Sequence, residues 1–98
     1  DQLTLPGMFA LHPNFPNPFN PSTTISYSLP EPSDVSIRIF DILGRSVWYK
    51  KNFNKVPGMH RITWHGKNTN GQPLASGVYF VEMKADKFIT YRKILLIK

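Results

Sequence analysis

The amino-acid sequence predicts an all-β fold, an antiparallel β-sandwich of about seven strands. Short runs of alternating apolar and polar residues recur along the chain, and turn-forming residues separate them. No segment places its apolar residues at helical spacing. Of the 98 residues, 41% are hydrophobic and 13% are aromatic, which is enough apolar material for the core of one such domain.

The distribution of proline indicates the domain organisation. Seven of the nine prolines fall within the first 32 residues, which separates a proline-rich N-terminal part from a proline-poor body. We expect a linker and lead-in segment at residues 1–14 and one β domain at residues 15–98. Because the chain begins at Asp1 without a methionine or a signal peptide, we expect it to be a fragment of a longer precursor.

The run Pro16–Ile25 predicts a rigid, extended ramp into the body of the domain. It contains three prolines, and proline fixes its own φ and favours extended geometry in the residue before it. Upstream of this run, Met8, Phe9 and Leu11 could dock on the body, and the lead-in segment could supply one further strand.

Six runs predict strands by their alternation. They are Thr24–Leu29, Val35–Asp41, Arg45–Phe53, Met59–His65, Val78–Lys84 and Phe88–Ile97. In the first run Ile25, Tyr27 and Leu29 share one face, and in the second the odd-numbered residues from Val35 to Ile39 do.

The later runs follow the same rule. In the third, alternation places Trp48 and Tyr49 on opposite faces, and in the fourth His60, Ile62 and Trp64 share one face. In the fifth, the odd-numbered positions 79–83 are tyrosine, valine and methionine. The sixth, apolar and aromatic run follows a tight connection at residues 85–87, which predicts a hairpin.

Turn chemistry supports these boundaries. Asp41 to Gly44 predicts a type I turn, in which the Asp41 carboxylate accepts backbone N–H groups and Gly44 takes the left-handed conformation. The Asn70-Gly71 step in a polar loop also favours positive φ. Strands and turns together predict an Ig-like antiparallel sandwich.

Composition excludes several kinds of site. The absence of cysteine removes disulfides, thiolate metal sites and cysteine nucleophiles. No apolar run exceeds four residues, against the roughly 18 needed to span a bilayer, so we expect no membrane insertion. The net charge of +6 divides into −3 for residues 1–37 and +9 for residues 38–98. The bases are scattered, with only Lys50-Lys51 and Arg92-Lys93 adjacent, so we interpret them as solvated surface charge and expect no nucleic acid as a partner.

Catalytic and metal-binding patterns are also missing from the sequence. His60 and His65 differ by an odd number, so on one strand they point to opposite faces, and His12 lies far away along the chain. Asp34 and Asp41 lie at opposite ends of one predicted strand, and no nucleophile or phosphate-binding motif occurs. We therefore expect no enzyme, no metal site and no cofactor.

A planar row of aromatic side chains on a sandwich could bind polysaccharide. The candidates are Trp48, Tyr49, Phe53, Trp64, Tyr79 and Tyr91. Most lie at spacings compatible with the core, so we predict that they are buried. Trp48 is the exception, because alternation cannot place it on the same face as Tyr49.

Five motifs are informative as an ordered set. They are PNPFNPSTTISYSLP at 16–30, VxIxIFDILGR at 35–45, GxHxxxW at 58–64, GQPLASGVYFV at 71–81 and RKILLIK at 92–98. In this order they make the chain resemble the C-terminal sorting domain of type IX secretion (type A), which is also similar to the Ig-like domain of the flagellar hook-capping protein. The resemblance runs from Phe15 to Lys98, where the chain ends as members of the family do.

The resemblance implies a role in delivery. Members are fused to the C-terminus of enzymes, adhesins and other cargo in Bacteroidetes-like bacteria, and the cargo reaches the periplasm by a signal peptide. It implies further that an outer-membrane translocon recognises the domain and that a surface sortase cuts upstream of it. The cargo then remains at the cell surface or is released outside the cell.

The resemblance also marks residues by position. The opening motif is Pro16, Asn17, Pro18 and Phe19; the turn motif is Asp41, Gly44 and Arg45; the glycine–aromatic motif is Gly77 and Tyr79; the basic C-terminal motif is Lys93 and Lys98. Together with Arg92, these two lysines flank the apolar run Ile94–Ile97. If this run lies at a sheet edge, it could pair with a strand of a partner, and the bases would guard it against promiscuous pairing.

Two other functions stay open on the sequence alone. The domain could be a structural spacer of a cell-surface or flagellar assembly, or a carbohydrate-binding module appended to a secreted enzyme. A sorting signal must end its reading frame after a large cargo, whereas a spacer can be internal.

Overall fold

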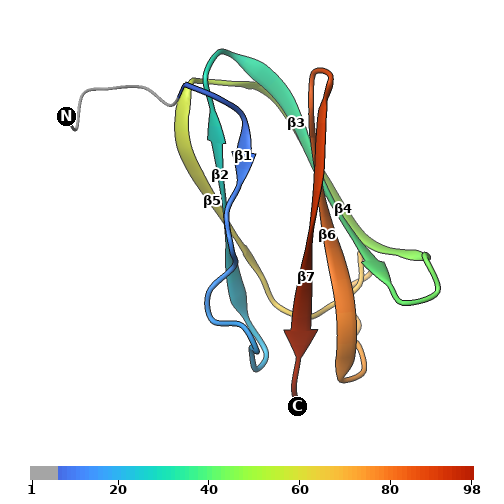
Figure 1. Ribbon diagram of the computed structural model, residues 1–98. Coiled ribbons are helices and arrows are strands. Elements are labelled where there is room, and N and C mark those ends of the chain that lie inside the picture. The colour runs from blue at the N-terminus through green and yellow to red at the C-terminus, as the bar shows by residue number, and fades with distance from the viewer. Residues whose placement is uncertain (1–6) are drawn as a thin grey trace.

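The computed structural model describes residues 7–98, and Figure 1 shows two β-sheets packed face to face. Its strands are β1 Ala10–Leu11, β2 Thr23–Leu29, β3 Ser33–Asp41, β4 Ser46–Lys55, β5 Gly58–Trp64, β6 Gly77–Ala85 and β7 Phe88–Leu96. One sheet has the order β1-β2-β5 and the other β4-β3-β6-β7, with every neighbouring pair antiparallel. The predicted sandwich is confirmed, and residues 1–6 of the predicted linker lie outside the described residues.

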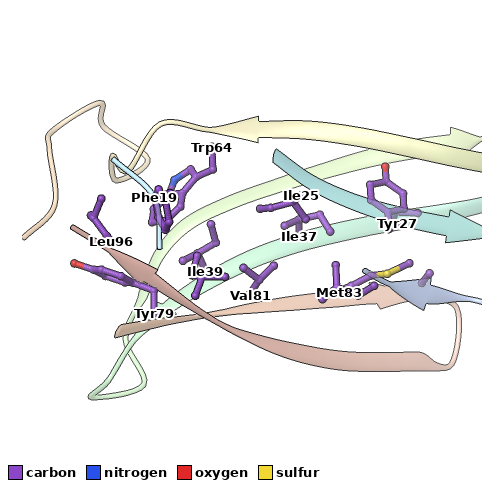
Figure 2. Packing of buried hydrophobic residues seen from close by; sticks show 14 of the residues in the cluster. Phe19, Ile25, Tyr27, Ile37, Ile39, Trp64, Tyr79, Val81, Met83 and Leu96 are labelled. Atoms are coloured by element: carbon purple, nitrogen blue, oxygen red, sulfur yellow. The ribbon is translucent and has the colours of Figure 1, made fainter. Parts of the chain in front are cut away.

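Alternation along the strands builds the core between the sheets. Val35, Ile37 and Ile39 of β3 are fully buried, as are Ile25 and Tyr27 of β2, which face them from the other sheet. Figure 2 shows Ile25, Ile37 and Ile39 meeting between the two layers. The faces predicted for these two strands are therefore confirmed, and burial of their apolar sides accounts for the packing of the sheets.

The lead-in segment joins this packing. β1 pairs with the end of β2, where Leu11 lies opposite Tyr27. Leu11 is buried, and the Phe9 ring stacks on the ring of Phe88 with centroids 5.6 Å apart. The further strand predicted for this segment is present, while Met8 stays exposed and does not dock.

The prediction of burial is wrong for three aromatic side chains. Tyr49, Phe53 and Tyr91 are exposed by 41%, 66% and 57%. They belong to β4 and β7, the two edge strands of the four-stranded sheet, and point away from the other sheet. Trp48 instead packs against the core from the inner face, opposite Ile39. The prediction that Trp48 and Tyr49 face opposite sides is confirmed, but Trp48 is not the exposed aromatic.

The connections between strands divide between two ends of the sandwich (Figure 1). The motif end, as we name it, contains the loops at residues 12–22, 42–45 and 65–76 and the C-terminal residues 97–98. The hairpin end contains the short turns at residues 30–32, 56–57 and 86–87. The motif end therefore holds the longer loops, and it is there that four distant parts of the chain meet.

Candidate functional site

The opening motif lies along the C-terminal half of β7. The Phe19 N–H donates to the Leu95 carbonyl oxygen at 2.9 Å, and the Ile97 N–H donates to the Phe19 carbonyl oxygen at 2.9 Å. Phe19 forms a parallel bridge with Leu96. The prediction of an extended ramp is wrong, because residues 16–23 bend into a loop that the antiparallel bridge between Phe15 and Thr24 closes. Within this loop, Phe19 adds a single-residue extension to the four-stranded sheet.

The Asn17 side chain continues this contact. Its Oδ1 accepts a hydrogen bond from the Leu95 N–H at 3.1 Å, and its Nδ2 donates to the Lys93 carbonyl oxygen at 3.5 Å. An asparagine side chain carries the same donor and acceptor pair as a peptide unit, so Asn17 occupies the place of a backbone strand. Pro18 lies between Asn17 and Phe19 and needs no donor there, because proline has no N–H.

These contacts correct the simplest form of the strand-pairing hypothesis. β7 is an edge strand, as that hypothesis requires. The outward-facing N–H groups of Leu95 and Ile97 and the Leu95 carbonyl are already bonded to Asn17 and Phe19. A partner strand therefore cannot add to this part of β7 while the opening motif remains in place.

Three aromatic rings close the core beneath the motif end. Figure 2 shows Phe19, Trp64 and Tyr79 side by side with Leu96. The Trp64 ring centroid lies 5.7 Å from that of Phe19 and 5.8 Å from that of Tyr79, and the latter pair meets edge to face. Such contacts add to the free energy of burying the rings. The opening motif and the glycine–aromatic motif are thus held by the same tryptophan.

The hydroxyl and indole groups of this cluster are satisfied by loop carbonyls. Trp64 Nε1 donates to the Lys67 carbonyl oxygen at 3.0 Å, and the Tyr79 hydroxyl donates to the Ala75 carbonyl oxygen at 2.6 Å. Burial raises the pKa of Tyr79, and the negative charge of Asp41 raises it further. Tyr79 therefore remains a neutral hydrogen-bond donor, which ties the loop at 65–76 to the core.

The turn motif has the chemistry that its sequence predicts. Asp41 Oδ1 accepts the backbone N–H groups of Leu43 and Arg45 at 2.9 and 3.0 Å, and Arg45 Nε donates to Oδ2 at 2.7 Å. Gly44 has a φ of 81°, the left-handed conformation that glycine adopts most readily. The hydrogen bond from the Arg45 N–H is the largest cause that lowers the pKa of Asp41. Both carboxylate oxygens serve the turn, so Asp41 has a structural task of its own.

The turn motif and Tyr79 line one hollow of about 700 Å³ at the surface. Its other walls include Val47, Leu74 and the polar loop residues 68–70. Ile42 and Leu43 at the tip of the turn are 70% and 72% exposed. An apolar pair held out into water beside a hollow is the kind of surface that marks an interaction site.

The remaining motif residues lie along β6 and β7. Gly77 opens β6 opposite Leu96, and the Lys98 N–H donates to the Ser76 hydroxyl at 2.9 Å. Lys93 and Lys98 have exposed side chains, whereas Arg92 Nε donates to the Leu11 carbonyl oxygen at 3.0 Å. Arg92 therefore links β7 to β1, whereas the side chains of Lys93 and Lys98 make no such link and lie exposed at the surface.

A polar network that the sequence did not predict lies below the opening motif. Asn14 is buried and donates to the Thr23 hydroxyl at 2.9 Å, and that hydroxyl donates to the Pro16 carbonyl oxygen at 2.8 Å. A Cβ on Gly66 would lie 2.9 Å from the Pro21 carbonyl oxygen. An asparagine and a threonine flanking a proline run were the available signal, because both residue types hydrogen-bond readily to nearby backbone.

No group of three or more histidine, cysteine, aspartate or glutamate side chains gathers within residues 7–98. His12, His60 and His65 each form a hydrogen bond, to Ser28, to the Val56 carbonyl and to Ser22 respectively. In this described range there is also no helix with the length and apolar character of a membrane span.

Similarity to solved structures agrees with the fold. PorZ, an essential bacterial surface component of the type IX secretion system of Porphyromonas gingivalis, superposes on 90% of this chain with a TM-score of 0.63 and 24% identity. Dimeric latent PorU of the same bacterium superposes on 97% of this chain with a TM-score of 0.74 and 21% identity. FlgD of P. aeruginosa covers 76% with a TM-score of 0.61 and 23% identity. The matched part is 11% of PorZ, 10% of PorU and 59% of FlgD, so the likeness concerns one domain of each.

Sequence comparison identifies the family. No curated protein sequence matches the chain. The sequence model described as "Secretion system C-terminal sorting domain" matches residues 14–98, which is nearly the whole chain and includes every motif described above. The chain therefore belongs to the family of secretion system C-terminal sorting domains, the sorting signals of type IX secretion.

Proposed function

We propose that this domain directs a cargo protein, fused to its N-terminus, from the periplasm across the outer membrane, and that the motif end is the surface read by the type IX translocon. In this proposal a surface sortase then removes the domain, and the cargo reaches the cell surface or the medium. Residues 1–14 join the domain to the cargo as linker and lead-in segment, of which β1 is already part of a sheet, and the domain itself performs no catalysis. Membership of the sorting-domain family supports the direction of transport.

One observation carries the choice of surface. All five motifs, separated by up to about 80 positions in sequence, reach the motif end, and four of them contribute the side chains of Phe19, Trp64, Tyr79 and Leu96 that pack together there (Figure 2). A spacer domain needs a core but does not require distant motifs to converge on one end. Convergence supports a surface that is recognised as a unit.

The exposed members of the motif end are the groups available to a receptor. Ile42 and Leu43 project beside the hollow, and Lys93 and Lys98 supply positive charge near the C-terminus. Apolar anchors with charges around them are the usual composition of a specific protein interface. Phe19, Trp64 and Tyr79 are buried and hold this surface in shape.

The test is export of a reporter. A fluorescent protein with an export signal peptide is fused to these 98 residues and expressed in a type IX-competent bacterium and in its translocon-deficient sibling. We expect fluorescence on the surface or in the medium of the first and in the periplasm of the second. Retention of a folded domain in the periplasm of both strains would contradict the proposal.

Surface variants then locate the recognition site. We expect Ile42→Ser with Leu43→Ser to reduce export without changing thermal unfolding, because both side chains are mostly exposed. The matched control is Phe53→Ser with Val56→Ser, two exposed apolar residues outside both the motif end and β7. Equal loss of export in the two double variants would mean that the motif end is not the surface that is read.

A further inference from the structure

The edge of β7 carries a regular row of backbone groups. In an antiparallel pair only alternate residue pairs exchange backbone hydrogen bonds. In the β6–β7 pair these are the even-numbered residues of β7, beginning with Phe88, which lies opposite Ala85 at the hairpin. The groups that face outward from the sheet therefore belong to alternate residues: Ile89, Tyr91, Lys93, Leu95 and Ile97. The hydrogen bonds to the last three confirm this direction, because they come from outside the sheet.

This row has an open half and an occupied half. Within residues 7–98, the outward N–H and C=O groups of Ile89 and Tyr91 form no hydrogen bond. The outward groups of Leu95, the Ile97 N–H and the Lys93 carbonyl are bonded to Asn17 and Phe19. The open half is too short for a full strand, since strands usually run over about five or six residues.

The occupied half includes a seat for one large side chain. Phe19 is 1% exposed and lies against Trp64 and Leu96, whereas Asn17 and Pro18, the two residues before it, are exposed. The segment thus holds β7 by one buried ring and a short set of hydrogen bonds. The segment runs parallel to β7 at Phe19.

We propose that the edge of β7 from Ile89 to Ile97 is a strand-addition site for a partner protein, and that the Asn17–Phe19 segment is its built-in, displaceable occupant. An extended partner segment pairs first with Ile89 and Tyr91. It then takes over the bonds at Lys93, Leu95 and Ile97 and seats a large apolar side chain where Phe19 lies. The backbone bonds supply general affinity, and this seat supplies selectivity.

Charge along the edge defines the partner further. Lys87 and Lys93 are exposed on β7 or its hairpin, and Lys98 follows the last bonded residue. A segment with acidic residues around one aromatic or large aliphatic residue complements this edge. The tethered occupant excludes weaker competitors, because its effective concentration is high. The same occupant keeps β7 from pairing with edges of unrelated proteins.

The inference rests on the proposed function only in assigning the partner to the secretion machinery, and its test uses the purified 98-residue chain. Hydrogen exchange by NMR is measured for β7 in Asn17→Ala and in Asn17→Ala with Phe19→Ala. Asn20→Ala is the matched control, an exposed asparagine of the same loop. We expect Asn17→Ala to lower protection of the Leu95 amide about two- to tenfold, the loss of one hydrogen bond. Ile94 and Leu96, which face β6, should keep their protection.

A peptide is then added to the double variant, to test whether the edge of β7 binds a strand from outside the chain. The probe has the sequence of residues 14–22 and is used at about 1 mM, the order of an effective concentration. We expect it to restore protection of Leu95 and Ile97 in the double variant, and the same peptide carrying Phe19→Ser not to do so. Loss of protection at Ile94 and Leu96 in the double variant would mean that the β6–β7 pair itself is disrupted. The peptide is then tested on Asn17→Ala alone.

Three results would overturn the inference. One is unchanged Leu95 protection in Asn17→Ala. Another is a folded variant in which the probe restores nothing. The third is protection that rises with protein concentration without peptide, because the occupant would then be a second copy of the chain. A negative peptide result with intact export would leave the proposed function standing and remove only this account of recognition.

Discussion

The two ends of the sandwich are closed by different means. At the hairpin end, turns of two or three residues join strands that are consecutive in sequence, and the Asp34 side chain accepts the Asn54 N–H across the β3–β4 pair at 2.9 Å. At the motif end, side chains bridge segments far apart in sequence, as when Asn17 bonds Leu95 or the Tyr79 hydroxyl reaches back to a loop carbonyl. The first end relies mainly on short turns with few side-chain contacts, whereas the second depends on several particular side chains.

This difference explains where the family motifs fall. A short turn accepts many sequences of similar backbone preference. Where side chains close the end of a sandwich, each position needs a particular group: a hydrogen-bond donor, an aromatic ring, or a glycine that has no Cβ. Most motif residues at the motif end therefore have a structural task, and the exposed few among them are the candidates for recognition.

The largest effect is expected from Trp64→Ala, which removes the ring shared by Phe19 and Tyr79. A fully buried tryptophan replaced by alanine costs about 3–5 kcal/mol of unfolding free energy. Phe53→Ala is the counterpart near the hairpin end, and because that ring is 66% exposed we expect a change within about 0.5 kcal/mol. Urea unfolding of both variants measures the difference, and similar losses would mean that the shared ring is not the centre of the motif end.

Gly66→Ala should rank second. The new Cβ would meet the Pro21 carbonyl oxygen at 2.9 Å, and Gly66 has a φ of 69°. Steric overlap and left-handed strain together cost about 2–5 kcal/mol. Gly71→Ala in the same loop isolates the strain, since its φ is 82° and no atom lies within 4 Å of the added Cβ, for which about 1–2 kcal/mol is expected. Equal melting temperatures for the two variants would show that the contact with Pro21 gives way at no cost.

Tyr79→Phe is expected to have a smaller effect. It removes only the hydroxyl that donates to the Ala75 carbonyl oxygen, so the loss is about 0.5–1.5 kcal/mol. Tyr91→Phe is the matched control, since the Tyr91 hydroxyl donates to the Glu82 carboxylate at 2.9 Å on the outer face of the sheet. If chemical denaturation shows Tyr91→Phe to be the more destabilising of the two, the tie between the loop at 65–76 and the core is weaker than its geometry indicates.

The sequence predicted the fold well because its signals are local. Alternation gave the inward faces of β2, β3 and β5, and turn chemistry gave the Asp41–Arg45 turn with its left-handed glycine. These features depend on spacing along one strand or within one turn. The family resemblance added the order of the motifs and was confirmed over residues 14–98.

The sequence predicted the site less completely, since the contacts there are not local. Nothing in the spacing of Asn17 shows that its amide bonds a strand more than 70 positions away. Alternation alone also cannot distinguish an inner from an outer face on an edge strand, so Tyr49, Phe53 and Tyr91 were wrongly expected in the core. The unpredicted contact of Asn17 and the wrong burial of the three aromatic side chains both depend on which strand lies at the edge of the sheet. Strand order is a property of the assembled sheet and not of one segment of the sequence.

The smallest effect is a pH dependence that belongs to the motif end. Asp41 has a lowered pKa in the folded domain, chiefly through the hydrogen bond from the Arg45 N–H, against an ordinary value of 3.8. A carboxylate with a lowered folded pKa stabilises the fold above its unfolded pKa, and this contribution is lost as pH falls below about 4 toward the folded value. We expect Asp41→Asn to be less stable than the parent at pH 7, because its amide cannot pair with the Arg45 guanidinium as a charge does. The gap should narrow as pH falls below about 4. Thermal melts of both proteins from neutral to acidic pH measure this gap. A constant gap would show that the charge of Asp41 adds nothing, and that the turn needs only an acceptor oxygen at that position.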